Sequence, residues 1–169
     1  AGGVRANVLG FADRRPNGEE LARMEELVRQ AMAEGAVGLS AALIYAPDSY
    51  ADTAELIALA RAAAEYDGLF AAHLRSEGET FLEALDEFLT IVREAGIRGE
   101  IYHLKASGRG NWPKLERVIA RVEAERAAGL PVTADMYTYH ASSTGLDAMM
   151  PGWVQEGGHR AWVERLRDP

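Results

Sequence analysis

The chain alternates between long amphipathic stretches and short apolar runs. In the long stretches apolar residues recur three or four positions apart on one face, which predicts helices. These stretches are 19–34, 53–66, 79–95 and 111–129, with a further predicted helix at 158–166. The short runs predict buried strands, at 36–40, 69–74, 100–104 and 131–137. Residues 4–12 have only a weak pattern and are compatible with a strand or with a loop before a helix.

Turn-forming and capping residues support these boundaries. Asn17 precedes the first long stretch and Asp52 or Thr53 precedes the second, where an N-cap is expected. Pro113 lies in the first turn of the fourth, a preferred position for proline. A glycine follows each long stretch, as is common at helix ends. These glycines are Gly35, Gly68, Gly96 and Gly129.

The ends of the predicted strands recur at similar intervals, at Ser40, His73, His103 and Asp135. Buried strands that alternate with helices require right-handed crossovers and form a parallel sheet covered by helices. No GxGxxG motif follows a strand, which disfavours a dinucleotide-binding sheet. A complete (β/α)₈ barrel needs about 250 residues. The 169 residues therefore predict an α/β fold that is a partial TIM barrel of about four to five βα units with parallel strands.

Composition narrows the possible functions. The net charge of -8 disfavours nucleic acid as a partner, because basic residues must neutralise its phosphates. The absence of cysteine excludes disulfides and thiolate ligands in this segment. No run of about 18 apolar residues exists, so a membrane span is not expected. The chain starts without methionine or a signal-peptide pattern. We expect a cytoplasmic protein of which this chain is an internal part.

Two histidines at strand ends are the main candidates for chemistry. Activity in a barrel lies at the C-terminal ends of its strands, where His73 and His103 are predicted on neighbouring strands about 4.8 Å apart. A lone strand-end histidine is more often a hydrogen-bonded residue beneath a loop, but two in register favour a shared Zn²⁺. Asp135 is either a third ligand or, as we prefer, a buried carboxylate that accepts hydrogen bonds from a neighbouring loop.

Basic and aromatic residues near these histidines are candidates for substrate binding. Arg75 and Lys105 each follow a histidine by two positions, so strand alternation points them the same way. Both could bind a substrate carboxylate, or they could pair with acidic residues such as Glu77 and position the loop. Tyr45 and Tyr137, in loops after strand ends, could donate hydroxyl hydrogen bonds or serve in packing.

Four segments together resemble a known family. They are 35–51, 72–77, 102–108 and 133–139, and they resemble the N-acyl-D-amino-acid deacylases (D-aminoacylases) of the amidohydrolase superfamily. The likeness covers essentially the whole chain, in the same order and spacing.

The resemblance implies a zinc-dependent hydrolase that cleaves the acyl group from a small-molecule N-acyl-D-amino acid. His73 and His103 would be the metal ligands from the fifth and sixth barrel strands. Tyr45, Lys105 and Tyr137 would hold the substrate, largely through its carboxylate. Zinc would activate water and polarise the amide carbonyl, and a carboxylate would act as general base.

The chain also departs from the family pattern. The His-x-His pair of the first strand, the bridging cysteine and the catalytic aspartate of the last strand are all missing. We interpret residues 1–169 as a single segment, the central-to-late part of the barrel, truncated at both ends. No catalytic residue is assigned within it. The isolated chain should be inactive and should depend on the missing parts of the barrel in its parent.

Two alternatives remain open. The parent could be another amidohydrolase, dihydroorotase-like or dipeptidase-like, that acts on a different amide. It could also be a non-catalytic barrel remnant, in which case His73 and His103 would bind no metal.

Overall fold

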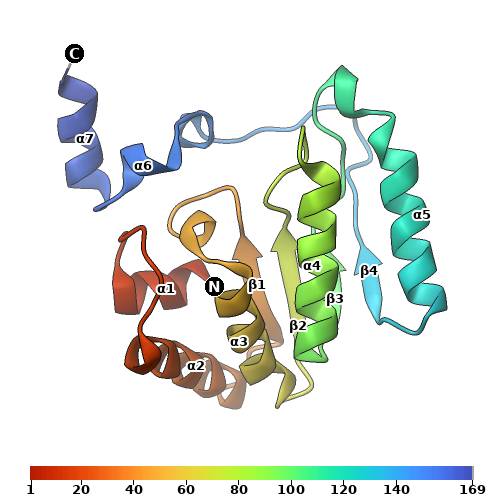
Figure 1. Ribbon diagram of the computed structural model, residues 1–169, viewed down its shortest axis with the longest axis horizontal. Helices are drawn as coiled ribbons and strands as arrows, with labels where there is room; N and C mark the ends of the chain where they lie inside the picture. The colour runs from red at the N-terminus through yellow and green to blue at the C-terminus, as the bar shows by residue number, and fades with distance from the viewer. Residues whose placement is uncertain (169) are drawn as a thin grey trace.

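A four-stranded parallel sheet organises the chain, and helices pack along one side of it (Figure 1). The computed structural model describes residues 1–168. The strands lie in the order β1-β2-β3-β4. Their bounds are Gly38–Ala42, Leu69–His73, Arg98–Ile101 and Val132–Ala134. Pro169, the end of the predicted segment, lies outside the described residues.

The sheet order separates two kinds of α/β fold. In a doubly wound sheet the strand order reverses at a switch point, whereas in a barrel each strand lies next to its predecessor. Here each strand pairs in parallel with the next one along the chain. This confirms the predicted parallel α/β fold and the partial barrel.

The four predicted long helices are present. They are α2 (Gly18–Ala33), α3 (Thr53–Ala64), α4 (Phe81–Ala95) and α5 (Lys114–Ala127). Helix α3 contacts β1 and β2, α4 contacts β3, and α5 contacts β4. The apolar stripe predicted for α4 is buried against the sheet. The core therefore lies between the helices and one face of the sheet, and the strand ends stay available at the rim.

A glycine allows the closest approach between the two layers. A Cβ atom on Gly99 of β3 would lie 2.5 Å from a methyl carbon of Val92 and 3.0 Å from the ring of Phe88, both on α4. Such distances are too short for carbon atoms. The absent side chain at Gly99 therefore lets α4 pack directly on β3, the strand that leads to His103.

The predicted N-caps of α2 and α3 are confirmed, whereas Pro113 lies at the N-cap of α5 and not in its first turn. Asn17 caps α2 in a capping box with Glu20: each side chain accepts a hydrogen bond from the backbone amide of the other residue. The Arg14 guanidinium and the amide of Asn17 lower the pKa of Glu20 to about 2. Of the two cap candidates for α3, Asp52 is the one that accepts the hydrogen bond, from the amide of Glu55 at 2.9 Å.

The helix at the N-terminus was not expected. The weakly patterned N-terminal stretch contains α1 (Gly2–Leu9). Its buried residues are Leu9 and an arginine, Arg5, which forms an ion pair with Glu55 of α3 and donates a 2.6 Å hydrogen bond to the carbonyl of Arg14. Because the inward face carries a charged residue, the hydrophobic periodicity that reveals other helices is missing.

The last part of the chain crosses above the strand ends. After β4 it runs extended across the upper edge of the sheet to α6 (Gly152–Gln155) and α7 (His159–Arg167), which matches the predicted last helix (Figure 1). The hydroxyl of Tyr50 donates to the carbonyl of Gly152 at 2.7 Å. Among residues 1–168, no helix is long and apolar enough to span a membrane.

Candidate metal centre

The two strand-end histidines lie together, as predicted. His73 is the last residue of β2, and His103 follows the end of β3 by two residues. Their ring centroids are 4.6 Å apart and the rings are nearly perpendicular, at 84°. The two strands end at the same edge of the sheet, with Ala72 paired to Ile101, so the residues that follow this pair lie close together.

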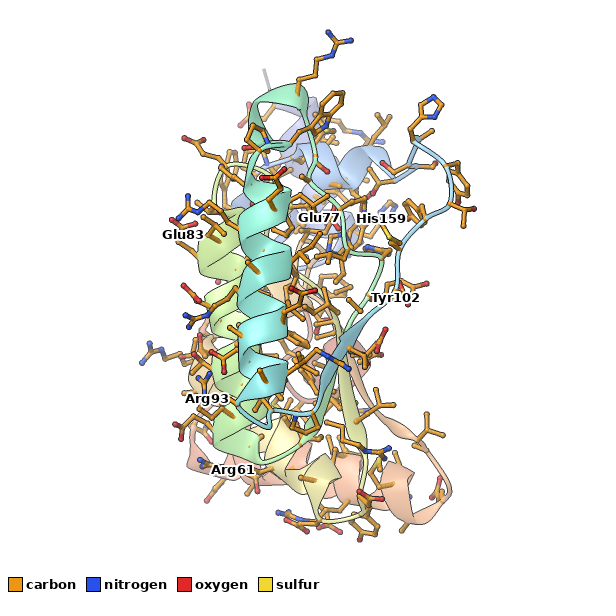
Figure 2. The ribbon with its side chains drawn as sticks, turned by 90° about the vertical axis from the view of Figure 1, so that its right-hand side faces the viewer. Arg61, Glu77, Glu83, Arg93, Tyr102 and His159 are labelled. Atoms are coloured by element: carbon orange, nitrogen blue, oxygen red, sulfur yellow. The ribbon has the colours of Figure 1, made fainter. Side chains whose placement is uncertain are left out.

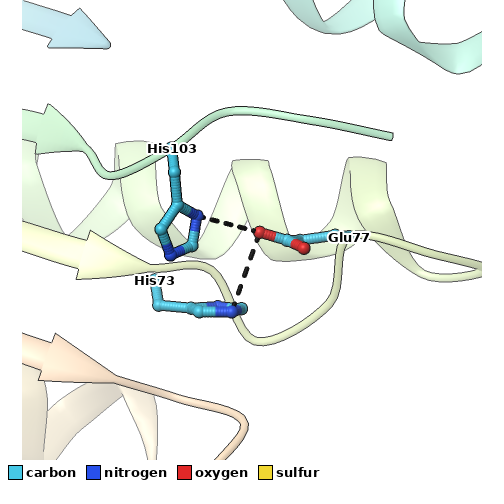
Figure 3. A group of neighbouring side chains, drawn as sticks. All are labelled: His73, Glu77 and His103. Atoms are coloured by element: carbon cyan, nitrogen blue, oxygen red, sulfur yellow. Dashed lines mark ion pairs between the residues drawn. The ribbon is translucent and has the colours of Figure 1, made fainter. Parts of the chain in front are cut away.

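A third donor, Glu77, lies beside them (Figure 3). Its Oε1 atom is 3.2 Å from Nδ1 of His103 and 3.7 Å from Nε2 of His73. Glu77 lies in the loop after β2, at the end of the molecule toward which the strands point, whereas Arg61 and Arg93 lie toward the opposite end (Figure 2). The sequence pattern indicates Glu77 only as a partner for basic residues.

The donor set fits a zinc ion. One donor atom from each of His73, Glu77 and His103 lies within 4.8 Å of the others. Ligands of tetrahedral zinc, at about 2.0–2.1 Å from the metal, are roughly 3.3 Å apart. Imidazole nitrogens and a carboxylate oxygen are also the donor types that zinc accepts when thiolates are absent.

The backbone carbonyl of the next residue orients the imidazole ring of His73. Nδ1 of His73 is 2.8 Å from the carbonyl oxygen of Leu74. A carbonyl only accepts, so Nδ1 carries the proton and Nε2 keeps a free lone pair, the usual arrangement of a metal-binding histidine. Burial lowers the pKa of His73, while the Leu74 carbonyl and the Glu77 charge oppose this effect. The neutral form that can bind a metal is therefore favoured.

The second ring is held differently. The backbone of His103 is left-handed, with φ 44°, a conformation uncommon for residues other than glycine. Its amide donates a hydrogen bond to the Asp135 carboxylate. Asp135 therefore accepts from a neighbouring loop, the role that we preferred. It is exposed rather than buried, and it does not belong to the group of donors around His73.

Three predicted substrate-binding residues surround the histidines. Nζ of Lys105 is 2.6 Å from Oε1 of Glu77 and 2.7 Å from Nδ1 of His103, and it lies 5.0 Å from the ring centroid of Tyr137. The rings of Tyr45 and Tyr137 flank the pair: the first lies 6.0 Å from that of His73, and the second 5.6 Å from that of His103.

The guanidinium of Arg75, the fourth predicted substrate-binding residue, already has hydrogen-bond partners. It forms hydrogen bonds of 2.8 and 3.0 Å to the Glu87 carboxylate, and others to the carbonyls of Ser49 and Ala51. The alternation that we used to orient Arg75 does not apply to it, because β2 ends at His73.

All six predicted site residues line one cleft of about 390 Å³. They are Tyr45, His73, Arg75, His103, Lys105 and Tyr137. The segment after β4 contributes Ser142, Thr144 and Met149 to the same cleft. A second cavity, of about 680 Å³, shares both histidines and both tyrosines with it. The donor group is thus open to small molecules rather than sealed inside the core.

Known proteins are similar to this chain in sequence and in fold. No protein-family model matches the chain. It is 39% identical over 76% of its length to an N-acyl-D-glutamate deacylase, and 36% identical over 85% to a D-aminoacylase, both from Alcaligenes xylosoxydans xylosoxydans. It covers only 26% and 29% of those relatives.

Solved structures of similar enzymes also match the chain. The crystal structure of N-acyl-D-glutamate deacylase from Bordetella bronchiseptica, in complex with zinc and a phosphonate inhibitor, superposes with a TM-score of 0.79 at 32% identity. The match covers 82% of this chain and 29% of that enzyme. A D-aminoacylase studied for its binuclear metal centre matches with a TM-score of 0.77 at 33% identity.

Proposed function

Because the chain belongs to the N-acyl-D-amino-acid deacylase family of amidohydrolases, we propose that its full-length protein is a zinc-dependent hydrolase that removes the acyl group from N-acyl-D-amino acids. The observation that carries this proposal is the meeting of His73, His103 and Glu77 at the strand ends, in a cleft that admits a small molecule. The relatives named above give no support to a dihydroorotase-like or dipeptidase-like activity.

In this proposal His73 and His103 hold the metal, and Glu77 supplies the third donor. When bound, zinc supplies an activated water and polarises the amide carbonyl. The chain's own contribution is to fix the ligands. His73 presents Nε2 because Leu74 holds its Nδ1 proton, and Glu77 spans the short distance between the two rings.

The substrate carboxylate binds beside the metal ligands. Lys105 provides the positive charge, and the hydroxyls of Tyr45 and Tyr137, which line the same cleft, provide neutral donors. Arg75 lines the same cleft, but Glu87 and two carbonyls engage its guanidinium. Its part in substrate binding stays a prediction, and we assign Lys105 the larger role.

The segment does not supply every part of an active site. We propose that residues 1–169 are the central-to-late part of a longer barrel, and that a general base and the remaining metal ligands come from the rest of the protein. The isolated segment should therefore be inactive. A cytoplasmic location also stays a prediction, which fractionation of cells expressing the full-length protein would test.

The test uses purified full-length protein, assayed with N-acetyl-D-glutamate and with its L enantiomer. The proposal expects bound zinc and release of acetate from the D form only. The variant His159→Ala, which removes a histidine of α7, should retain both properties. Protein that contains no zinc, or that hydrolyses neither enantiomer nor any other N-acyl-D-amino acid, would overturn the proposal.

A further inference from the structure

The chain leaves the regular β3–β4 ladder at the point where it presents His103. The amide of Asp135 still donates to the carbonyl of Ile101 at 3.2 Å, and the amide of Leu104 donates to the carbonyl of Asp135 at 2.8 Å. Between these two bonds, Tyr102 and His103 bulge out of the ladder. The amide of His103 therefore has no backbone partner on β4.

The side chain of Asp135 takes the place of that partner. Its Oδ1 atom accepts the hydrogen bond from the His103 amide. A charged acceptor makes a stronger hydrogen bond than a neutral one, and His103 is only 9% exposed, so water is a poor substitute. Asp135, the residue that follows β4, thus bonds to the chain on both sides of the bulge, at Ile101 and Leu104, and at its centre.

This contact determines where the imidazole points. A left-handed residue turns its side chain away from the direction that a strand would give it, and such backbone conformations persist only where neighbours impose them. Without the Asp135 acceptor, the His103 amide would be buried and unpaired, and the loop could relax toward an extended backbone. The ring would then leave the position in which it faces His73 and Glu77.

We propose that Asp135 is a positioning residue for the metal site: it fixes the left-handed backbone of His103 and so aims the imidazole at the metal, without binding the metal itself. This inference rests on the proposed function, because it requires His103 to be a ligand. It makes the hydrogen-bond acceptor at position 135 essential and its negative charge dispensable.

The experiment tests the hydrogen-bond acceptor and the negative charge at position 135 separately. Full-length protein stripped of metal is titrated with zinc in competition with a chromogenic chelator, as wild type, Asp135→Ala and Asp135→Asn. Loss of a residue that supports a ligand weakens metal binding roughly 10–100-fold, and we expect this for Asp135→Ala. Asparagine keeps an acceptor oxygen, so Asp135→Asn should bind zinc within about fivefold of wild type.

Controls keep the outcomes distinct. The variant Asp86→Ala removes an exposed aspartate of α4 and should not change zinc affinity. Circular dichroism establishes whether each variant is folded, and if Asp135→Ala does not fold, Asp135→Asn alone decides. Equal losses in Asp135→Asn and Asp135→Ala would overturn the inference, because they would make the charge essential. Wild-type affinity in folded Asp135→Ala would also overturn it, whereas wild-type protein without zinc binding would refute the proposed function itself.

Discussion

The ends of β2 and β3 each deliver a histidine to the same place, but by different means. His73 is still part of its strand and pairs in register with Ala42 of β1, and its ring is held by the next carbonyl in its own chain. His103 lies beyond its strand in a left-handed conformation, and its amide is held by Asp135, the residue that follows β4. The regular strand end positions its histidine locally, whereas the irregular one depends on the residue that follows a neighbouring strand.

Glu77 links the chain segments that follow β2 and β3. Its carboxylate reaches both rings and Lys105, and its backbone carbonyl accepts a 2.8 Å hydrogen bond from the amide of Ser107. The loops after β2 and β3 are therefore joined at the residue that could itself bind the metal. Through this link His73 and His103 form one site, although they are held in different ways.

The largest effect is expected from removing either ring. His73→Ala and His103→Ala should each weaken zinc binding of the full-length protein by more than about 100-fold, beyond the range seen for supporting residues. Equilibrium dialysis against zinc measures this. If one variant kept near-normal affinity, the metal would not be shared between the two strand ends.

Glu77→Gln should have the second largest effect on zinc affinity. It keeps the shape of the side chain but removes the charge that faces both rings, and we expect zinc affinity to fall by about tenfold to 100-fold. Glu87→Gln is the matched control, since Glu87 pairs with Arg75 rather than with the histidines. Unchanged affinity in Glu77→Gln would show that the two loops do not depend on this carboxylate for metal binding.

The comparison extends to Lys105 and Arg75, the basic residues that follow the two histidines. Lys105→Met should raise the KM for an N-acyl-D-amino acid about tenfold or more, since a hydrogen bond to a charged group is lost. Arg75→Met should change KM by less than about threefold and should lower stability by about 1–2 kcal/mol instead, because it breaks contacts that are only partly exposed. Steady-state kinetics and urea unfolding measure the two effects. The opposite ranking of KM would give Arg75 the main role in substrate binding.

The smallest effect is expected far from the strand ends. Asp52→Ala removes the N-cap of α3 and should lower stability by about 1 kcal/mol without changing zinc affinity. Thermal unfolding and zinc titration of the same samples test this. A marked loss of zinc binding would mean that the site is coupled to the helical layer rather than built at the rim.

Hydrophobic periodicity was sufficient to predict most of the fold. Strands and helices that repeat along the chain have few other ways to pack, and β2, α3 and α4 lie within two residues of their predicted starts or ends. Helix α1 was missed because its inward face contains Arg5, which is buried through its pairing with Glu55. Periodicity cannot reveal a buried face whose charge is neutralised by a distant residue.

The site was partly predictable for the same reason. The ends of β2 and β3 lie at the same edge of the sheet, so His73 and His103 are close once both are placed near strand ends. Glu77 and Arg75 lie in a loop, where no periodicity relates sequence position to direction. The sequence predicts a strand at 100–104, but β3 ends at Ile101. The left-handed turn at His103 that follows is accompanied by a hydrogen bond to Asp135, a residue that only the tertiary structure brings near.

Crystals of the zinc-loaded full-length protein, measured at the zinc absorption edge, would test the central claim most directly. Zinc bound at these two strand ends should give an anomalous peak about 2.0–2.1 Å from one nitrogen of His73 and one of His103. A map in which the zinc peak lies elsewhere, with neither ring within bonding distance, would contradict it.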